Sequence, residues 1–458
     1  MTTSATNNND SRYNDAEHKK LFLIGNLSIF MIGLGFAVRT AIAGNLQADI
    51  YDHIDLANST TLLGEALGFT FTGFAFTLLL GSALVDLVGI KLMLLLSAVG
   101  YVVGSGLIVA ASLLPVSPVV ETLVLVGLLL TGLGWGAVEA ATNPMVASID
   151  PERKTHRLNI LHAWWPAGIA VGGVLTLACS KVGLPWQSNL ALLAIPACVM
   201  AYLVATAKFP VTERVAAGVA YGTMFREVFR QPLFILLWFC MWLTAATELA
   251  PSQWVDLTLS RVVGMKGIVI LIYVSLLMFV MRHFAGALAH RLSAVGVLWF
   301  SSLTAALGLY ALSLARSPAT AFLAATVWGI GVCYMWPTML ATVADRFRRG
   351  GALFLGLLGF GGGLSIQFVL PKLGAIFDQA KIEAAGGLEA FEQLAGAELD
   401  AVLSHASVVS FQSVAIVPVV LLPLFGFIWL LDRRGLAAKK SEKASENGSE
   451  VTGNVLEP

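Results

Sequence analysis

Charged residues are scarce in this sequence of 458 residues, where Asp, Glu, Lys and Arg together make up 12%. Hydrophobic residues make up 57%, and many of them occur in long runs without a charge. A water-soluble chain of this composition could not cover its apolar residues with a polar surface. The scarcity of charge therefore argues against a soluble globular protein and predicts one that lies in a lipid bilayer.

Other absences exclude several classes of function. Lys and Arg equal Asp and Glu at 28 residues each, and no basic block or basic-aromatic stripe occurs, so we expect no nucleic-acid binding. There is no Gly-rich phosphate loop ending in Lys-Ser or Lys-Thr, which argues against an ATP-driven pump. The sequence also lacks a convergent set of nucleophile, base and metal ligands, so we expect neither an enzyme nor a bound cofactor.

The cysteines and the N-terminus add little. The four cysteines lie in apolar segments at unrelated spacings, which indicates small packed side chains rather than disulfides or a metal site. They are Cys179, Cys198, Cys240 and Cys333. The first 20 residues are polar and contain no apolar core, so we expect no removable signal peptide.

Twelve apolar segments are long enough to cross a membrane, which takes about 20 residues at 1.5 Å rise per residue. They are residues 21–44, 60–84, 90–112, 119–143, 158–181, 187–207, 232–257, 266–288, 293–314, 319–343, 351–375 and 408–432. The polar stretch 208–231 separates the sixth from the seventh. The sequence therefore predicts an all-α membrane protein with twelve transmembrane helices, arranged as two six-helix pseudo-symmetric bundles over 21–207 and 232–432.

The positive charges predict the orientation. Of the 28 Lys and Arg residues, 21 fall on the side of the N-terminus and six on the opposite side. Because cytoplasmic loops carry the excess of positive charge, we expect both termini in the cytoplasm and the protein in the cell (inner) membrane. The tails 1–20 and 433–458 are then cytoplasmic, the latter disordered, and the acidic segment 378–407 lies outside as one or two amphipathic helices.

The two halves repeat one another at the turn between their second and third spans. Residues 82–89 read SALVDLVG and residues 286–293 read GALAHRLS. Parallel six-helix repeats of this kind are typical of transporters that work by alternating access. Here the chain resembles the major facilitator superfamily, whose signature in this turn is Gly-x-Leu-Ala-Asp-Arg-x-Gly-Arg-Lys. The first copy matches it in part through Asp86, Gly89 and Lys91, and the second through Arg291 among others.

That resemblance implies the major facilitator fold. It also implies that these four residues belong to a latch that stabilises one conformation, because in the superfamily the acid caps a neighbouring helix in the outward-facing state. An ordinary loop carboxylate at Asp86 is the alternative.

Glu139 is a carboxylate in the middle of the fourth span. Burying a charge at the centre of a membrane helix costs about 2.5–3.5 kcal/mol, so such residues usually face a cavity. At 3.6 residues per turn, Trp135, Glu139 and Asn143 share one face. Pro144 follows and loosens the backbone. A carboxyl group there can take up and release a proton as its surroundings change, which predicts proton coupling, although a Glu fixed to a neighbouring helix is the alternative.

Further polar and aromatic residues lie in the fifth and seventh spans. Asn159, His162 and Trp165 share one helix face, and such a combination suits a sugar or another ring-bearing polyol. Tryptophans that merely sit at the membrane interface would leave a similar pattern. Glu248 falls in the outer third of the seventh span, where a role at the rim competes with a central one.

The tract from the fourth to the fifth span is similar to the fucose:proton symporter family within the superfamily. The matching residues are Glu139, Asn143, Pro144, Arg157, Leu158 and Asn159, with Glu248, Trp254, Met335, Pro337 and Thr338 matching in the seventh and tenth spans. In that family the carboxylate at the position of Glu139 is implicated in proton coupling. Residues of its first, fourth and fifth spans contact the sugar.

The first span departs from that family, because Arg39 and Thr40 stand approximately where its members have Asn-Asp. A guanidinium keeps its proton, so in a cavity it needs a carboxylate partner or an anionic ligand. We expect Arg39 to pair with Glu139 or Glu248, or to receive the acid group of a substrate; the alternative is that it snorkels to the interface. Arg282, near the inner end of the eighth span, is interpreted as a snorkelling or gating residue.

The sequence thus predicts a secondary transporter that moves a small polar solute, sugar-like or sugar-acid-like, by proton symport. Sodium is the alternative coupling ion, and we expect a monomer. Two other functions stay open: an efflux antiporter for organic anions or amphipathic compounds, and a non-transporting nutrient sensor.

Overall fold

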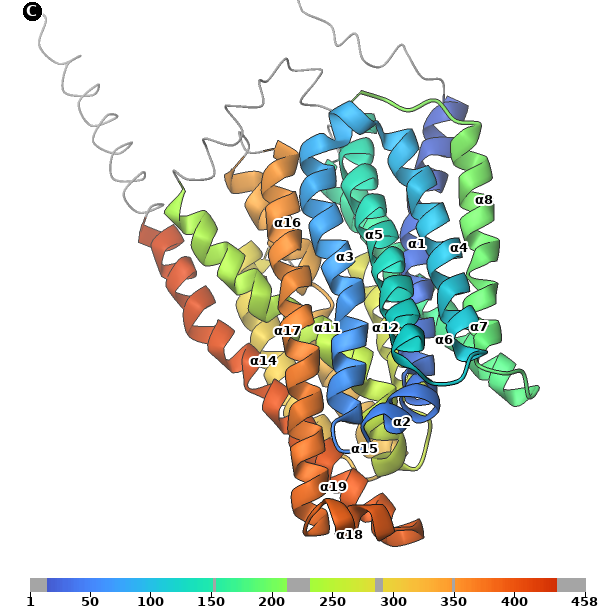
Figure 1. The fold of residues 1–458 in the computed structure, drawn as a ribbon. Helices are drawn as coiled ribbons and strands as arrows, with labels where there is room; N and C mark the ends of the chain where they lie inside the picture. The colour runs from blue at the N-terminus through green and yellow to red at the C-terminus, as the bar shows by residue number, and fades with distance from the viewer. Residues whose placement is uncertain (1–14, 151–153, 212–230, 285–290, 348–350, 435–458) are drawn as a thin grey trace, which may run out of the picture.

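The structure is a computed structural model that describes residues 15–150, 154–211, 231–284, 291–347 and 351–434. Within these ranges the chain is helical and has no β-strand. Figure 1 shows the long helices running side by side as one bundle. The N-terminal half contains α1 (Asp15–Leu46), the π-helix η1 (Gln47–Tyr51), α2 (Asp52–Ile54), α3 (Ser59–Val88), α4 (Ile90–Ser112), α5 (Pro118–Ile149), α6 (Lys154–Lys181), α7 (Gln187–Leu192) and α8 (Ala194–Ala205).

The C-terminal half contains α11 (Pro232–Val263), α12 (Ile268–Arg282), α14 (Ala294–Ser313), α15 (Pro318–Val332), α16 (Met335–Arg346), α17 (Gly351–Ala385), α18 (Leu388–Gln393) and α19 (Gly396–Ala415). Among the described residues, eleven helices are long and apolar enough to cross a membrane, and Ile268–Arg282 is a shorter apolar helix. Each of the twelve predicted segments corresponds to one of these. The prediction of an all-α protein with twelve membrane helices is confirmed.

Several membrane helices are interrupted by proline. Pro166 lies inside α6 and Pro251 inside α11, and the tenth span is broken into α15 and α16 just before Pro337. Proline has no N–H, so the carbonyl four residues earlier loses its helical partner. These breaks matter because each leaves a backbone acceptor free inside the bundle.

Helices α3 and α17 pack closely where the two halves meet, as Figure 1 shows. A Cβ atom at Gly64 would lie 2.7 Å from the carbonyl oxygen of Leu370, and one at Gly374 would lie 2.4 Å from that of Thr60. These glycines permit a backbone approach that no side chain would allow. The contact lies at the end of the bundle that contains α2 and α18, which we call the outer end after the orientation that the sequence predicts.

A buried ion pair within α17 contacts the N-terminal half at this outer end. Lys381 Nζ lies 2.6 Å from Asp378 Oδ1 and also donates to the carbonyl oxygen of Leu56 at 2.9 Å. Asp378 Oδ2 accepts from the backbone N–H and the hydroxyl of Thr61, both at 2.7 Å, at the start of α3. A carboxylate in this place satisfies N–H groups that have no helical partner. We call these contacts the outer lock.

The outer lock also changes the interpretation of the acidic segment. The eleventh span was expected to end near residue 375, but α17 continues to Ala385, and Asp378 and Lys381 are 3% and 2% exposed. The first residues of segment 378–407 are therefore part of the contact between the halves. Most of the predicted loop 208–231 and of the tails 1–20 and 433–458 lies outside the described residues.

Candidate functional site

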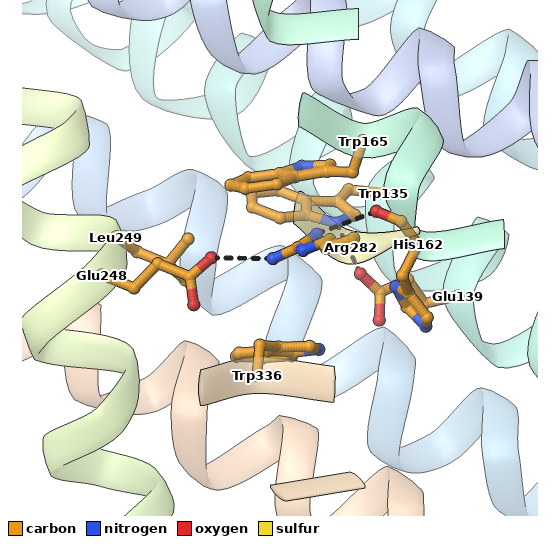
Figure 2. A pocket seen from close by; sticks show the side chains of 8 residues that line it. All are labelled: Trp135, Glu139, His162, Trp165, Glu248, Leu249, Arg282 and Trp336. Carbon is orange, nitrogen blue, oxygen red and sulfur yellow. Dashed lines mark hydrogen bonds and ion pairs between the residues drawn. The ribbon is translucent and has the colours of Figure 1, made fainter. Parts of the chain in front are cut away.

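A small cavity lies between the two halves of the protein. Helices α5 and α6 contribute its residues from the N-terminal half, and α11, α12 and α16 contribute those from the C-terminal half. The lining residues, shown in Figure 2, are Trp135, Glu139, His162, Trp165, Glu248, Leu249, Arg282 and Trp336. The cavity volume is about 20 Å³, which is room for a single water. The helices must therefore move apart before a larger solute can enter.

Arg282 lies at the centre of this cavity and is held by both halves. Its Nη1 donates to the carbonyl oxygen of His162 at 2.8 Å, and its Nε donates to that of Cys333 at 2.9 Å. His162 precedes Pro166 by four residues, and Cys333 precedes Pro337 by four. Both carbonyls are therefore free to accept because proline leaves them without a helical donor. The two prolines thus leave free the carbonyl oxygens that bind the guanidinium.

Two carboxylates lie on either side of Arg282, as Figure 2 shows. Glu248 Oε1 is 3.4 Å from Arg282 Nη2, while Glu248 Oε2 has no hydrogen-bond partner among the described residues. Glu139 accepts a hydrogen bond from Trp135 Nε1 at 3.2 Å. Glu139, Glu248 and Arg282 are 5%, 2% and 4% exposed. Their charges are therefore shielded from water and interact mainly with one another.

Three tryptophans give the cavity flat walls. Trp135 packs against Phe74 with ring centroids 4.5 Å apart, and Trp336 lies 6.2 Å from the same phenylalanine. Trp165 is 8% exposed, and its Nε1 has no hydrogen-bond partner among the described residues. Indole faces can stack on a ring, and their N–H groups can donate to hydroxyl or carboxylate oxygens. The walls therefore suit a compact solute with a ring or polyol body.

Arg39 lies behind Trp135 and does not line the cavity. Its Cζ is 5.6 Å from the centroid of the Trp135 ring and 5.9 Å from that of Phe36. It is 2% exposed, so the alternative that it snorkels to the surface is wrong. Its Nε and Nη2 have no hydrogen-bond partner among the described residues, and no ion pair joins it there to Glu139 or Glu248. Glu248 instead pairs with Arg282.

The predicted asparagines lie outside the cavity lining. Asn143 Oδ1 lies 3.0 Å from His162 Nε2 and so holds the imidazole in place. Asn159 is half-buried, one turn before His162. Trp164 is 37% exposed, whereas its neighbour Trp165 faces the cavity. The structure thus brings Trp135, Glu139, His162, Trp165 and Glu248 together from the predicted set.

The predicted latch residues do not line this cavity and lie at the ends of helices. Gly89 has φ 84° and separates α3 from α4. Lys91 Nζ donates to the carbonyl oxygen of Ala205 at 2.6 Å, a contact within the N-terminal half. Asp86 is half-buried and Arg291 exposed, and residues 286–290 of the second copy lie outside the described residues. The described contact of Lys91 does not itself join the two halves.

Three residues of the cavity lining are not among the predicted substrate-binding residues: Leu249, Arg282 and Trp336. The alternative that Arg282 snorkels is wrong, because the side chain is buried. It donates to carbonyl oxygens of both halves, and its role as a gating residue stays a prediction. The sequence contains a pattern that indicates the position of Arg282. Pro166 and Pro337 each leave a backbone carbonyl without its helical donor, and a cation inside the membrane needs such acceptors.

Comparisons with known proteins agree with this architecture. The sequence model of the family described as Major Facilitator Superfamily matches residues 22–371. No curated protein sequence matches the chain. The fold is similar to a crystal structure of a D-xylose-proton symporter, with a TM-score of 0.69 at 14% identity, covering 85% of this chain and 96% of that one.

Two further structures have the same fold. The E. coli fucose:proton symporter gives a TM-score of 0.58 at 15% identity, covering 88% of this chain and 98% of that one. A human organic anion transporter gives 0.61 at 12% identity, covering 89% and 99%.

Proposed function

Because the chain belongs to the major facilitator superfamily, whose members transport solutes across membranes and are not enzymes, we propose that it imports a small polar solute, sugar-like or sugar-acid-like, together with a proton. The observation that carries this proposal is the cavity between the halves, where Glu139 and Glu248 lie on either side of Arg282. The similarity of the fold to two sugar:proton symporters supports it. The proposal includes a cell-membrane location with both termini in the cytoplasm.

Glu139 is the proton carrier in this proposal. It faces the cavity and accepts a hydrogen bond from Trp135. When it binds a proton, the balance of charge around Arg282 changes, because one of the two carboxylates that attract the guanidinium becomes neutral. The solute occupies the space between the tryptophans. Alternating access then follows when the outer lock opens and the contacts of Arg282 across the halves rearrange.

The test is transport by the purified protein in sealed liposomes. We expect Glu139→Gln to lose accumulation driven by a pH gradient while keeping counterflow of labelled solute, because exchange needs no net proton movement. Glu65→Gln is the matched control, since Glu65 is an exposed carboxylate on α3. If Glu139→Gln accumulates solute as the unmodified protein does, Glu139 is not the proton carrier.

Export of organic anions is the second candidate. Arg39 favours it, because a buried guanidinium that has no carboxylate partner in the described part of the chain attracts negative charge. One protein with a similar fold is an organic anion transporter. The direction of the gradient separates the two. Uptake into the liposome by symport requires a higher proton concentration outside. Uptake by antiport requires a higher proton concentration inside, because protons leave as the solute enters.

A further inference from the structure

Four charged side chains are buried in the central region, and their charges cancel. Glu139 and Glu248 are negative, Arg282 and Arg39 are positive, and none is more than 5% exposed. The other titratable groups that face them are His162 on α6, Tyr101 on α4, and Cys333 and Tyr334 at the α15–α16 break. With both carboxylates and both guanidinium groups ionised and these other groups neutral, the buried charges sum to zero.

A net charge carried through the membrane in a closed site is costly, and transport that keeps this balance avoids that cost. A neutral solute leaves the balance unchanged, and a proton that moves with it adds one net charge. A solute with one negative charge disturbs the balance by one unit. Protonation of one carboxylate restores the balance. The charges of the site therefore link a proton to an anionic solute.

The geometry around Arg282 provides a place for that anion. Two of the guanidinium's nitrogens donate to backbone carbonyls, which bring no charge. The contact with Glu248 is 3.4 Å, longer than the 2.7–2.9 Å that is typical of charge-assisted hydrogen bonds. Glu139 lies on the opposite side of Arg282 in Figure 2. Once Glu139 is protonated, a carboxylate of the solute can take over the charge that Glu139 has lost.

We propose that the solute is a monoanion, an organic acid with a single carboxylate on a ring or polyol body, and that each molecule moves with one proton, so that transport carries no net charge. The proposal rests on the proposed function and specifies its substrate class. The carboxylate pairs with Arg282 and accepts a hydrogen bond from protonated Glu139. The body lies against the indole faces of Trp165 and Trp336. The proton enters with the solute on one side and leaves with it on the other, and no bond is made or broken in the solute.

The experiment measures uptake by the full-length protein in liposomes, with the pH gradient and the membrane potential set separately. D-Glucuronate and D-gluconate are the anionic probes, and D-glucose is the matched neutral probe. With one proton per monoanion, a gradient of one pH unit accumulates the acid up to about tenfold. A potential of 100 mV leaves this unchanged, whereas it shifts accumulation about fiftyfold when one net charge moves.

The Glu139→Gln variant sharpens the test, because an amide mimics the protonated side chain. Under the proposal, the variant binds the anion without a proton, so its uptake loses the response to pH and becomes sensitive to potential. If the solute is neutral and moves with a proton, the opposite change is expected: the unmodified protein responds to potential and the variant does not. Glu65→Gln should behave as the unmodified protein in either case.

The outcomes separate the two proposals. Accumulation of D-glucose that responds to potential overturns the monoanion proposal and leaves proton symport intact. Accumulation of an acid that responds to potential overturns the one-to-one balance. Failure of a pH gradient to drive uptake of any probe overturns both.

Discussion

The outer lock offers a prediction whose size follows from the structure. Lys381 Nζ lies 2.6 Å from Asp378 Oδ1, and the two side chains are 2% and 4% exposed. Replacing Lys381 by Met leaves a buried carboxylate without its counter-charge. Breaking a buried ion pair by removing one partner costs about 3–5 kcal/mol. Because the pair is buried against Leu56 and Thr61 only when the outer ends are together, this energy is lost from the outer-closed conformation.

The population of the outer-open conformation should rise accordingly. At about 1.4 kcal/mol for each tenfold change, a cost of 3–5 kcal/mol corresponds to about two to three and a half orders of magnitude. Asp378→Asn should act in the same direction by leaving Lys381 unpaired. The double variant should lose less than the two single variants together, because no buried charge remains.

Cysteine labelling measures this change. Ser59 is 0% exposed at the start of α3, so Ser59→Cys should react with a membrane-impermeant maleimide only when the outer ends separate. The exposed Cys198 is replaced by Ser in the same background. Lys372→Met is the matched control, since Lys372 is an exposed residue of α17. Equal labelling rates in Lys381→Met and in the unmodified protein would refute the reasoning, as would additive effects in the double variant.

Two further predictions concern the cavity. Trp336→Ala should raise the apparent KM about tenfold, because a stacked aromatic face contributes about 0.5–1.5 kcal/mol beyond its buried area. Trp336→Phe keeps an aromatic face and should change the KM less than threefold. Initial uptake rates measure both variants, and equal KM values would exclude stacking of the solute on Trp336. Pro337→Ala restores an N–H that competes with Arg282 for the Cys333 carbonyl, so solute binding should weaken by about 1 kcal/mol. Titration calorimetry checks this, with Pro318→Ala at the first turn of α15 as the control, and an unchanged affinity would contradict it.

The twelve helices were predictable because each depends on its own run of apolar residues. Which side chains of different spans contact one another depends on their depth in the membrane. The sequence predicts this depth less accurately than it predicts the helices. Glu248 was placed in the outer third of its span, yet it lies across Arg282 from Glu139. Arg282 was placed at an inner end, yet its side chain is buried and reaches the carbonyl oxygens of His162 and Cys333.

The outer lock was missed for a different reason. Asp378 and Lys381 occur in a segment rich in Glu and Asp, and composition alone predicts a solvated surface there. Their burial depends on Gly64 and Gly374, which let α3 and α17 approach until the carboxylate reaches the N–H of Thr61. Such an approach joins residues more than 300 positions apart, and no local pattern reports it.

The contacts of Arg282 connect the site to the movement of the halves. Its Nη1 bonds to the N-terminal half through the His162 carbonyl, while its Nε and Nη2 bond to the C-terminal half through Cys333 and Glu248. A solute carboxylate that draws the guanidinium toward itself must weaken at least one of these bonds, because the donors are fixed in one plane. If the bond to His162 weakens, the halves lose a contact at the cavity. Binding at this one side chain can therefore change how strongly the two halves hold together.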